Sequence, residues 1–158
     1  MASCCFTGHR DLSDSEFNRA YTEALQTIEE LYDFFGVDVF MTGGAIGFDT
    51  AVSEALITAK ENGMNIKMIL AVPCADQDKY WNSAAKKEYR RIKEHCDKIM
   101  VLSEEYHNGC MLERNRFMVD NTDYCVAFLR KNTITGGTLY TVRYACEKNK
   151  KVINICKV

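Results

Sequence analysis

Short apolar runs alternate with segments of helical periodicity along this chain, and this alternation constrains the fold more than any other feature. The apolar runs predict six strands, at residues 2–7, 37–41, 66–72, 98–102, 124–129 and 151–155. Helical spacing of apolar residues predicts five helices between them. Four lie at about 14–35, 83–95, 111–120 and 137–149, and the other has Asp49 in its first turn and ends at Asn62-Gly63. Apolar strands that alternate with helices are typical of a parallel sheet covered on both faces. The sequence therefore predicts an α/β fold with a mostly parallel sheet between two layers of helices.

Composition and charge narrow the class of protein. The 158 residues are 47% hydrophobic, enough for the core of one domain over residues 1–158. The apolar runs are shorter than the ~20 residues that span a bilayer. No secretory signal is recognisable, so we expect a cytoplasmic protein that does not enter the membrane. Lys and Arg total 20 against 22 for Asp and Glu, which argues against general coating of nucleic acid.

The eight cysteines contain no C-x-x-C pair, so their spacing fits neither a zinc ribbon nor a thioredoxin-type site. Several of them lie inside apolar runs, where a free thiol behaves as a small hydrophobic side chain. We therefore expect reduced thiols, no bound metal and no cofactor.

The first predicted strand is followed by Thr7-Gly8-His9-Arg10. Ligands of parallel sheets bind at the carboxyl ends of the strands, so all four residues are candidates for ligand contact. Glycine permits a close backbone approach, and Arg10 offers a fork for a phosphate or carboxylate. His9 could bind a ligand or transfer a proton near neutral pH. The alternative is a plain turn with exposed polar side chains.

The second strand runs into a glycine-rich segment at 42–49 that opens a helix. Its glycines are Gly43, Gly44 and Gly47. Free amides at the positive end of a helix dipole attract anions, so this segment predicts a phosphate site, although its spacing is neither G-x-G-x-x-G nor a P-loop. Asp49 and Glu54 on that helix are candidate catalytic carboxylates. Their alternative roles are stabilisation of the helix start by Asp49 and a solvated position for Glu54.

A second glycine-rich helix start follows the fifth strand, where Gly136, Gly137 and Thr138 combine backbone amides with a hydroxyl. This composition suits a phosphate or a ribose. Two such starts in one small α/β domain indicate a nucleotide-sized anion more strongly than either would alone.

Three further residues are candidates for ligand contact. Arg114 and Asn115 occupy a turn of helix 111–120 that should be apolar, so these side chains either tie the core together or contact a ligand. Trp81, the only tryptophan, could stack on a base, and its alternative role is packing.

Five motifs occur in order between about Cys4 and Ile155: TGHR, TGGAIGFDTAVSEAL, P-x-x-x-Q-x-x-x-W, ERNRFMVDNTD and TGGTLYTVRYA. Together they resemble the YpsA-like branch of the SLOG superfamily, which joins the DNA-processing protein A fold to the Lonely Guy phosphoribohydrolases. The resemblance implies a single Rossmann-like, three-layer domain that binds nucleotides or nucleotide-derived ligands. Related folds often associate through helices beside the site, so we also expect a homo-oligomer.

Two departures from these relatives rank the candidate functions. The DNA-processing relatives carry a basic residue in the glycine loop, where this chain has Ile46, which makes single-stranded DNA an unexpected partner. The phosphoribohydrolases carry a glutamate soon after their P-G-G-x-G-T loop. No acid follows Thr138 within two turns, so only Asp49 or Glu54 could take its place. We therefore expect a sensor or sequestering protein for a small nucleotide-like ligand, with a nucleotide N-glycosidase and a single-strand binder as alternatives.

Overall fold

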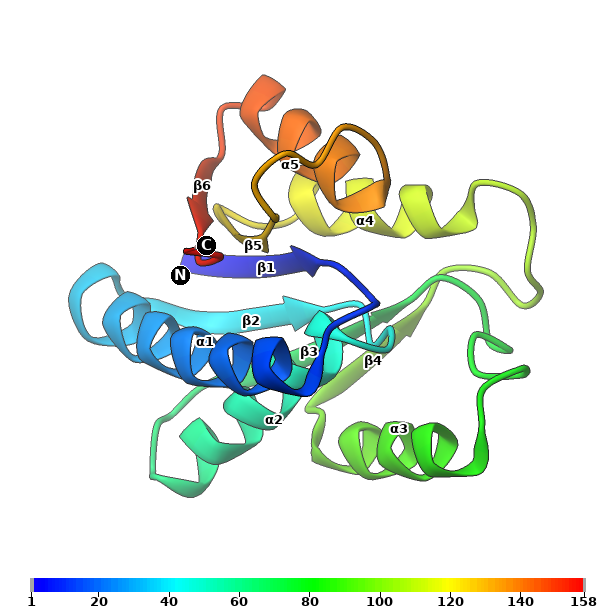
Figure 1. The fold of residues 1–158 in the computed structure, drawn as a ribbon. Helices are drawn as coiled ribbons and strands as arrows, with labels where there is room; N and C mark the ends of the chain where they lie inside the picture. Colours follow the sequence, from blue (N-terminus) through cyan, green and yellow to red (C-terminus); the bar gives the residue numbers. More distant parts are fainter. Residues whose placement is uncertain (1, 158) are drawn as a thin grey trace.

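The structure is a computed structural model that describes residues 2–157. Strands and helices alternate from end to end (Figure 1). The strands are β1 (Ala2–Gly8), β2 (Val37–Thr42), β3 (Lys67–Val72), β4 (Lys98–Val101), β5 (Tyr124–Phe128) and β6 (Lys151–Asn154). The helices are α1 (Asp14–Phe35), α2 (Phe48–Glu61), α3 (Ser83–His95), α4 (Cys110–Asp120) and α5 (Gly137–Glu147). These ends lie within two residues of those that the sequence predicts.

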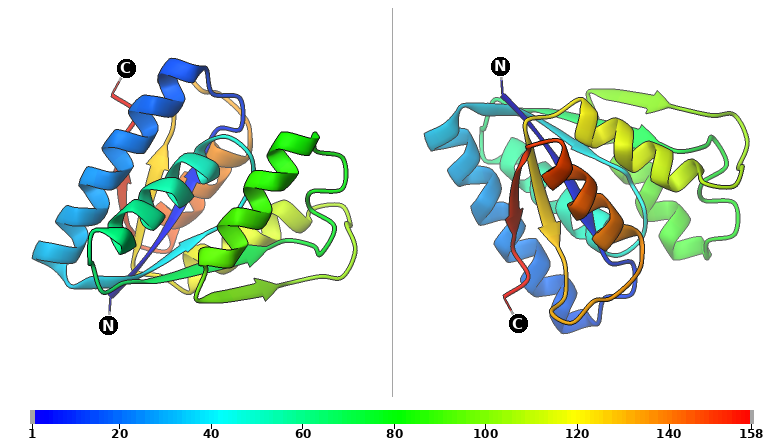
Figure 2. Two further views of the ribbon diagram at one scale, coloured as in Figure 1. Left: turned by 90° about the horizontal axis from the view of Figure 1, so that it is seen from below. Right: turned by 90° about the horizontal axis from the view of Figure 1, so that it is seen from above.

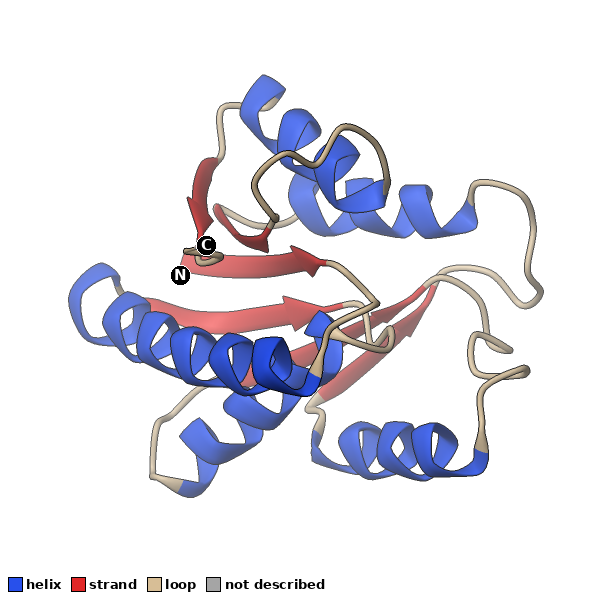
Figure 3. Ribbon diagram, viewed as in Figure 1, coloured by secondary structure: helices blue, strands red, loops and turns tan. Residues whose placement is uncertain are grey.

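The strands form one parallel sheet in the order β4-β3-β2-β1-β5-β6. Helices α1, α2 and α3 cover one face and α4 and α5 cover the other (Figure 3). The views from below and from above show each helix layer in front of the sheet (Figure 2). The predicted α/β fold with a parallel sheet and helices on both faces is therefore confirmed. None of the helices in residues 2–157 combines the length and hydropathy needed to cross a membrane.

Burial on both faces explains why the central strand β1 is apolar, whereas the edge strands β4 and β6 are largely exposed. The adjacent residues Cys4 and Cys5 point to opposite faces, and both are fully buried. Cys4 packs with Phe6 and Phe40 in the core under α1 and α2, while Cys5 packs with Met118 in the core under α4 and α5. A free thiol is small enough to fill either layer.

Helix α1 begins and ends as its sequence predicts. Ser13 and Glu16 form a reciprocal capping box, and Gly36 ends the helix in the left-handed conformation at φ +68°. Helical spacing puts Phe35 on the same apolar stripe as Ile28 and Leu31, but its side chain is 59% exposed. The last turn of α1 lies where the strands begin, and the ring of Phe35 contacts the edge of Tyr124 there.

The strand order fixes where a ligand can bind. Strand β1 pairs with β2 on one side and with β5 on the other. The chain leaves β1 toward α1 on one face and leaves β5 toward α5 on the opposite face (Figure 1). The two loops therefore diverge at the carboxyl ends of neighbouring strands, which is the position where open α/β sheets bind ligands.

Candidate functional site

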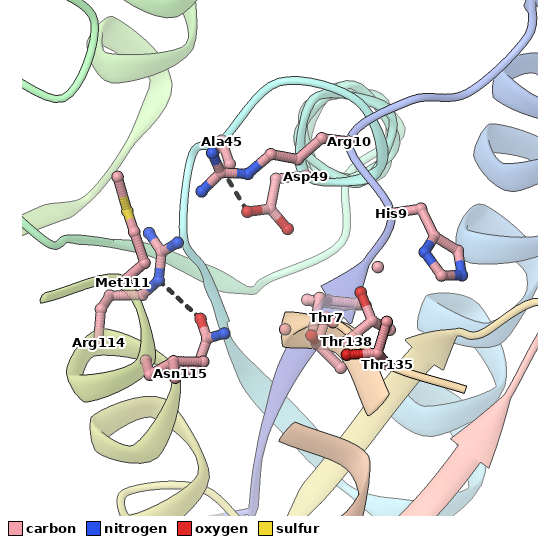
Figure 4. Close-up of a pocket in the computed structure, with 15 residues that line it drawn as sticks. Thr7, His9, Arg10, Ala45, Asp49, Met111, Arg114, Asn115, Thr135 and Thr138 are labelled. Atoms are coloured by element: carbon pink, nitrogen blue, oxygen red, sulfur yellow. Dashed lines mark hydrogen bonds between the residues drawn. The ribbon is translucent and has the colours of Figure 1, made fainter. Parts of the chain in front are cut away.

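A cavity of about 280 Å³ lies at this divergence (Figure 4). Its walls come from the end of β1 and the loop after it, from the starts of α2 and α4, and from the start of α5. The lining residues are Phe6, Thr7, Gly8, His9, Arg10, Ala45, Asp49, Met111, Leu112, Arg114, Asn115, Thr135, Gly136, Gly137 and Thr138.

The cavity brings together most of the residues that the sequence singles out, although they come from four segments far apart in the chain. Those in its lining are Thr7, Gly8, His9, Arg10, Asp49, Arg114, Asn115, Gly136, Gly137 and Thr138. The predicted residues that lie outside its lining are Gly43, Gly44, Gly47, Glu54 and Trp81.

The start of α5 is open toward the cavity. Gly136 precedes the helix at φ +111°, no side chain caps the helix, and its first turn contains no acidic residue. A Cβ atom at Gly136 would meet nothing within 4 Å, and one at Gly137 would meet only Leu112 Cδ2, at 3.9 Å. The space beside both glycines is therefore open, and Thr138 lines the cavity next to them.

The start of α2 is closed by the protein itself. A Cβ atom at Gly43 would lie 2.5 Å from the Nη1 atom of Arg114, so the guanidinium occupies the space that a side chain would need. Gly47, at φ +84°, packs in the same way against the backbone of Arg10. These glycines therefore admit other parts of the protein, and Gly44 has φ +69° and lies against Leu70. Their role in holding a phosphate stays a prediction.

Arg114 anchors this closed loop. Its guanidinium is 3% exposed and donates from Nη1 to the carbonyls of Gly43, at 2.6 Å, and Ala71, at 3.2 Å. Its Nε donates to Oδ1 of Asn115, whose amide donates in turn to Thr141. Of the two roles considered for Arg114, tying the core together is therefore present, and the same side chain also reaches the cavity wall.

Arg10 is the exposed arginine of the cavity lining, whereas Arg114 is buried. Arg10 extends over Asp49 (Figure 4). The side chain makes no hydrogen bond or ion pair with another residue between 2 and 157, so its charge is available to an anion.

Asp49 is the acidic residue of the cavity lining. Its Oδ2 accepts a hydrogen bond of 3.1 Å from the amide of Ala45, so the carboxylate supplies the α2 loop with an anion of its own. Burial raises the pKa of Asp49, while the nearby charge of Arg114, the Ala45 amide and the charge of Arg10 oppose that rise.

His9 is held by a residue that the sequence reasoning missed. Its Nε2 accepts a hydrogen bond of 3.0 Å from the backbone amide of Arg130, so the proton of the neutral ring is on Nδ1. Burial and the charge of Arg130 both lower the pKa of His9, so the ring is neutral near pH 7. Arg130 also donates to Glu16, at 2.8 Å, and to Asp11, at 3.2 Å. Its position directly after a strand, like that of Arg10, is the signal that could have identified it.

Met111 and Leu112 are a second omission. They begin the apolar stripe of α4 and read as core residues, but both are half-buried and line the cavity. They give one wall an apolar surface that suits a ring or a sugar face.

Glu54 and Trp81 are engaged elsewhere. Glu54 lies between α2 and α3, where it pairs with Arg91. Burial and a neighbouring carboxyl, Glu88, raise the pKa of Glu54 to about 7. Trp81 packs edge-on against Tyr89, with ring centroids 5.1 Å apart. Across residues 2–157, no three His, Cys, Asp or Glu side chains are grouped to hold a metal.

This fold defines a Rossmann-like α/β protein with a cavity where the chain switches direction between β1 and β5. A comparison with family models assigns it more narrowly. The YpsA model, described as the YspA SLOG family, matches residues 6–157. The chain therefore belongs to the YpsA family of SLOG proteins.

Two curated proteins resemble the sequence. The uncharacterized SPbeta prophage-derived protein YoqJ of Bacillus subtilis (strain 168) is 32% identical over 115 residues, or 65% of this chain and 67% of that protein. A UPF0398 protein of Levilactobacillus brevis is 27% identical over 93 residues, or 58% of this chain and 49% of that protein. The chain thus spans about two thirds of the first relative and half of the second.

Two solved structures share the fold. DNA processing protein A from Helicobacter pylori, described for its single-stranded DNA binding mode, matches with a TM-score of 0.67 and 18% identity. The match covers 96% of this chain and 63% of that one. The protein TM1055 matches with a TM-score of 0.62 and 16% identity, covering 96% of this chain and 72% of that one.

Proposed function

We propose that the cavity binds a small nucleotide or nucleotide-derived ligand and holds a phosphate at the start of α5. The observation that carries this proposal is the open, uncapped start of α5 facing the same cavity as Arg10, whose charge is unpaired among residues 2–157. Backbone amides at a helix start and an arginine fork are the two standard partners of a phosphate.

The rest of the lining suits the nucleoside part of such a ligand. Met111 and Leu112 offer apolar surface, while Asp49 and Asn115 offer polar atoms that suit the hydroxyls of a ribose. Arg114 contributes positive charge from the cavity wall while it remains bonded to the α2 loop. The phosphate site is thus built from Arg10, Gly136, Gly137 and Thr138, without the glycines of that loop.

The test compares nucleoside 5′-monophosphates with the matching nucleosides by titration calorimetry. We expect the monophosphates to bind and the nucleosides to bind at least about tenfold more weakly, because charge-assisted bonds to phosphate are the strong contacts. Equal affinity for a nucleoside and its phosphate would contradict the phosphate site.

A matched pair of variants tests the position of the phosphate. Gly137→Asp places a carboxylate in the first turn of α5, which favours the helix but repels a phosphate, whereas Gly137→Asn is similar in size and neutral. We expect the Asp variant to lose at least about tenfold in affinity, and the Asn variant to lose much less. Equal losses of affinity in the two variants would mean that the new side chain acts by steric blockage and not through its charge.

A second candidate function is cleavage of a nucleotide N-glycosidic bond. It is favoured by one observation: Asp49 is a buried carboxyl of raised pKa in the lining of the cavity. Chromatography after prolonged incubation with nucleoside monophosphates would detect a released base. Release by the wild type that is lost in Asp49→Asn would establish the enzyme, and absence of release would leave the binding function.

Single-stranded DNA is a test ligand because of the likeness to DNA processing protein A. We propose that it is not the physiological ligand, since the net charge is −2 and Ile46 takes the place of a basic residue. Sub-micromolar binding of an oligonucleotide near physiological salt would reverse this ranking.

A further inference from the structure

A second hollow lies on the other side of the loop that leads into α5. It measures about 290 Å³ and shares Thr135 and Gly136 with the first cavity, so the two hollows meet at the loop that leads into α5. Gly136 carries no side chain, and a Cβ atom there would meet nothing within 4 Å. No side chain of Gly136 therefore stands between the two hollows.

Two tyrosines form the floor of this second hollow. Tyr140 and Tyr144 lie one turn apart on α5 with their rings nearly parallel, at 11°, and their centroids 6.3 Å apart. The hydroxyl of Tyr140 accepts a hydrogen bond of 2.9 Å from Arg116, and that of Tyr144 donates at 2.8 Å to Asp120. Because both hydroxyls are tied to α4, the rings are held in place before any ligand arrives.

The hollow also has the polarity of a ring-binding site. Ile134 is 86% exposed at its rim and Tyr140 is 37% exposed, so apolar and aromatic surface faces solvent there. Arg143 lines the same hollow and forms no ion pair within residues 2–157. Glu147 lies in the lining as well, which disfavours a phosphate next to it and leaves the phosphate at Thr135 and Gly136.

We propose that Tyr140 and Tyr144 form a second subsite that stacks an aromatic base joined through phosphate to the nucleoside in the first cavity. The ligand class is then a phosphate-bridged dinucleotide, with its bridge at the start of α5 and one nucleoside on each side of Gly136. This inference rests on the proposed nucleotide-binding function and extends it. Stacking on aromatic rings suits any base, since every base has a π-face.

The experiment measures affinity for three probes by calorimetry: adenosine 5′-monophosphate, adenosine 5′-diphosphate and P1,P2-di(adenosine-5′) diphosphate. We expect the dinucleotide to bind at least about tenfold more tightly than either mononucleotide, the size of one base stack. Tyr140→Ala is expected to abolish this gain and to leave mononucleotide affinity within about twofold, while Tyr140→Phe keeps the gain. Tyr80→Ala, at a tyrosine that is 89% exposed, is the control and changes neither affinity.

The outcomes separate the two proposals. If mononucleotides bind and the dinucleotide gains nothing, the subsite is overturned and the proposed function stands. If none of the probes binds, both fail. Light scattering of the wild type and Tyr140→Ala gives an independent reading, because a loss of oligomer in the variant with no change in dinucleotide affinity would assign the tyrosines to a second copy of the chain and overturn the subsite.

Discussion

The glycine-rich starts of α2 and α5 look alike in the sequence and differ in what fills them. At α2 the space beside Gly43 is occupied by the Arg114 guanidinium, and the carboxylate of Asp49 accepts a hydrogen bond from the backbone amide of Ala45. At α5 the space beside Gly136 is empty, and the first turn has no acidic residue. Glycine at a helix start therefore indicates a close approach, and the tertiary structure decides whether protein or ligand makes it.

The two loops are also anchored by different arginines. Arg114 is buried and holds the α2 loop through two backbone carbonyls. Arg130 follows β5, remains partly exposed, and joins the β5–α5 loop to Glu16 and His9. Removing one partner of a buried charged contact destabilises a fold far more than removing one partner of a surface ion pair, so perturbing the two loops should give effects of different size.

The largest expected effect is that of Arg114→Ala. The substitution removes the Arg114 donor from the carbonyls of Gly43 and Ala71 and one of the two positive charges that act on Asp49, so we expect a loss of about 3–5 kcal/mol in the free energy of unfolding. Urea denaturation measures it, with Arg10→Ala as the control, which should stay within about 0.5 kcal/mol. A loss below about 1 kcal/mol would mean that Arg114 serves ligand binding rather than the stability of the fold.

Alanine at one glycine of each loop tests the comparison directly. Gly43→Ala forces a methyl group against the guanidinium, which is a case of overpacking, and we expect it to cost about 1–3 kcal/mol. Gly137→Ala adds a methyl group in free space at the start of a helix and should be neutral or stabilise by about 0.4–1 kcal/mol. Thermal unfolding of both variants gives the two values, and equal destabilisation would break the distinction drawn between the loops.

The smallest expected effect concerns the surface ion pair between Arg130 and Glu16, whose contribution to stability depends on pH. The hydrogen bonds from Arg130 and from the Ser13 backbone lower the pKa of Glu16 from 4.5 to about 2. Because the folded-state pKa is depressed, this contribution is fully present above pH 4.5 and is lost as the pH falls toward 2.

Glu16→Gln should therefore destabilise the protein by up to about 1 kcal/mol near pH 7 and approach the wild type near pH 2. Urea midpoints measured across this range check the expectation, with Glu30→Gln on the exposed side of α1 as the reference. If the difference in stability between Glu16→Gln and wild type stays constant with pH, the contact with Arg130 does not act through the charge of Glu16.

Much of the fold could be predicted because its signals are local. The capping box of Ser13 and Glu16 and the left-handed Gly36 set the ends of α1 within a few residues of sequence. Most of the cavity lining also followed from one geometric rule, that residues after parallel strands gather at the same edge. Phe35 shows the limit of that reasoning, since helical spacing does not say where the sheet beneath the helix stops.

The chain by itself determined the alternation of strands and helices, the apolar strands and the positions of the loops, because each depends on residues that are near neighbours in sequence. Only the tertiary structure decided that Arg114 fills the α2 loop 71 residues before it, that Glu54 faces Arg91 and that Trp81 lies on Tyr89. These contacts depend on the order of strands and on which helix crosses which face. Local periodicity does not specify that order. Two similar glycine-rich segments therefore form one loop that is filled by protein side chains and one that is open.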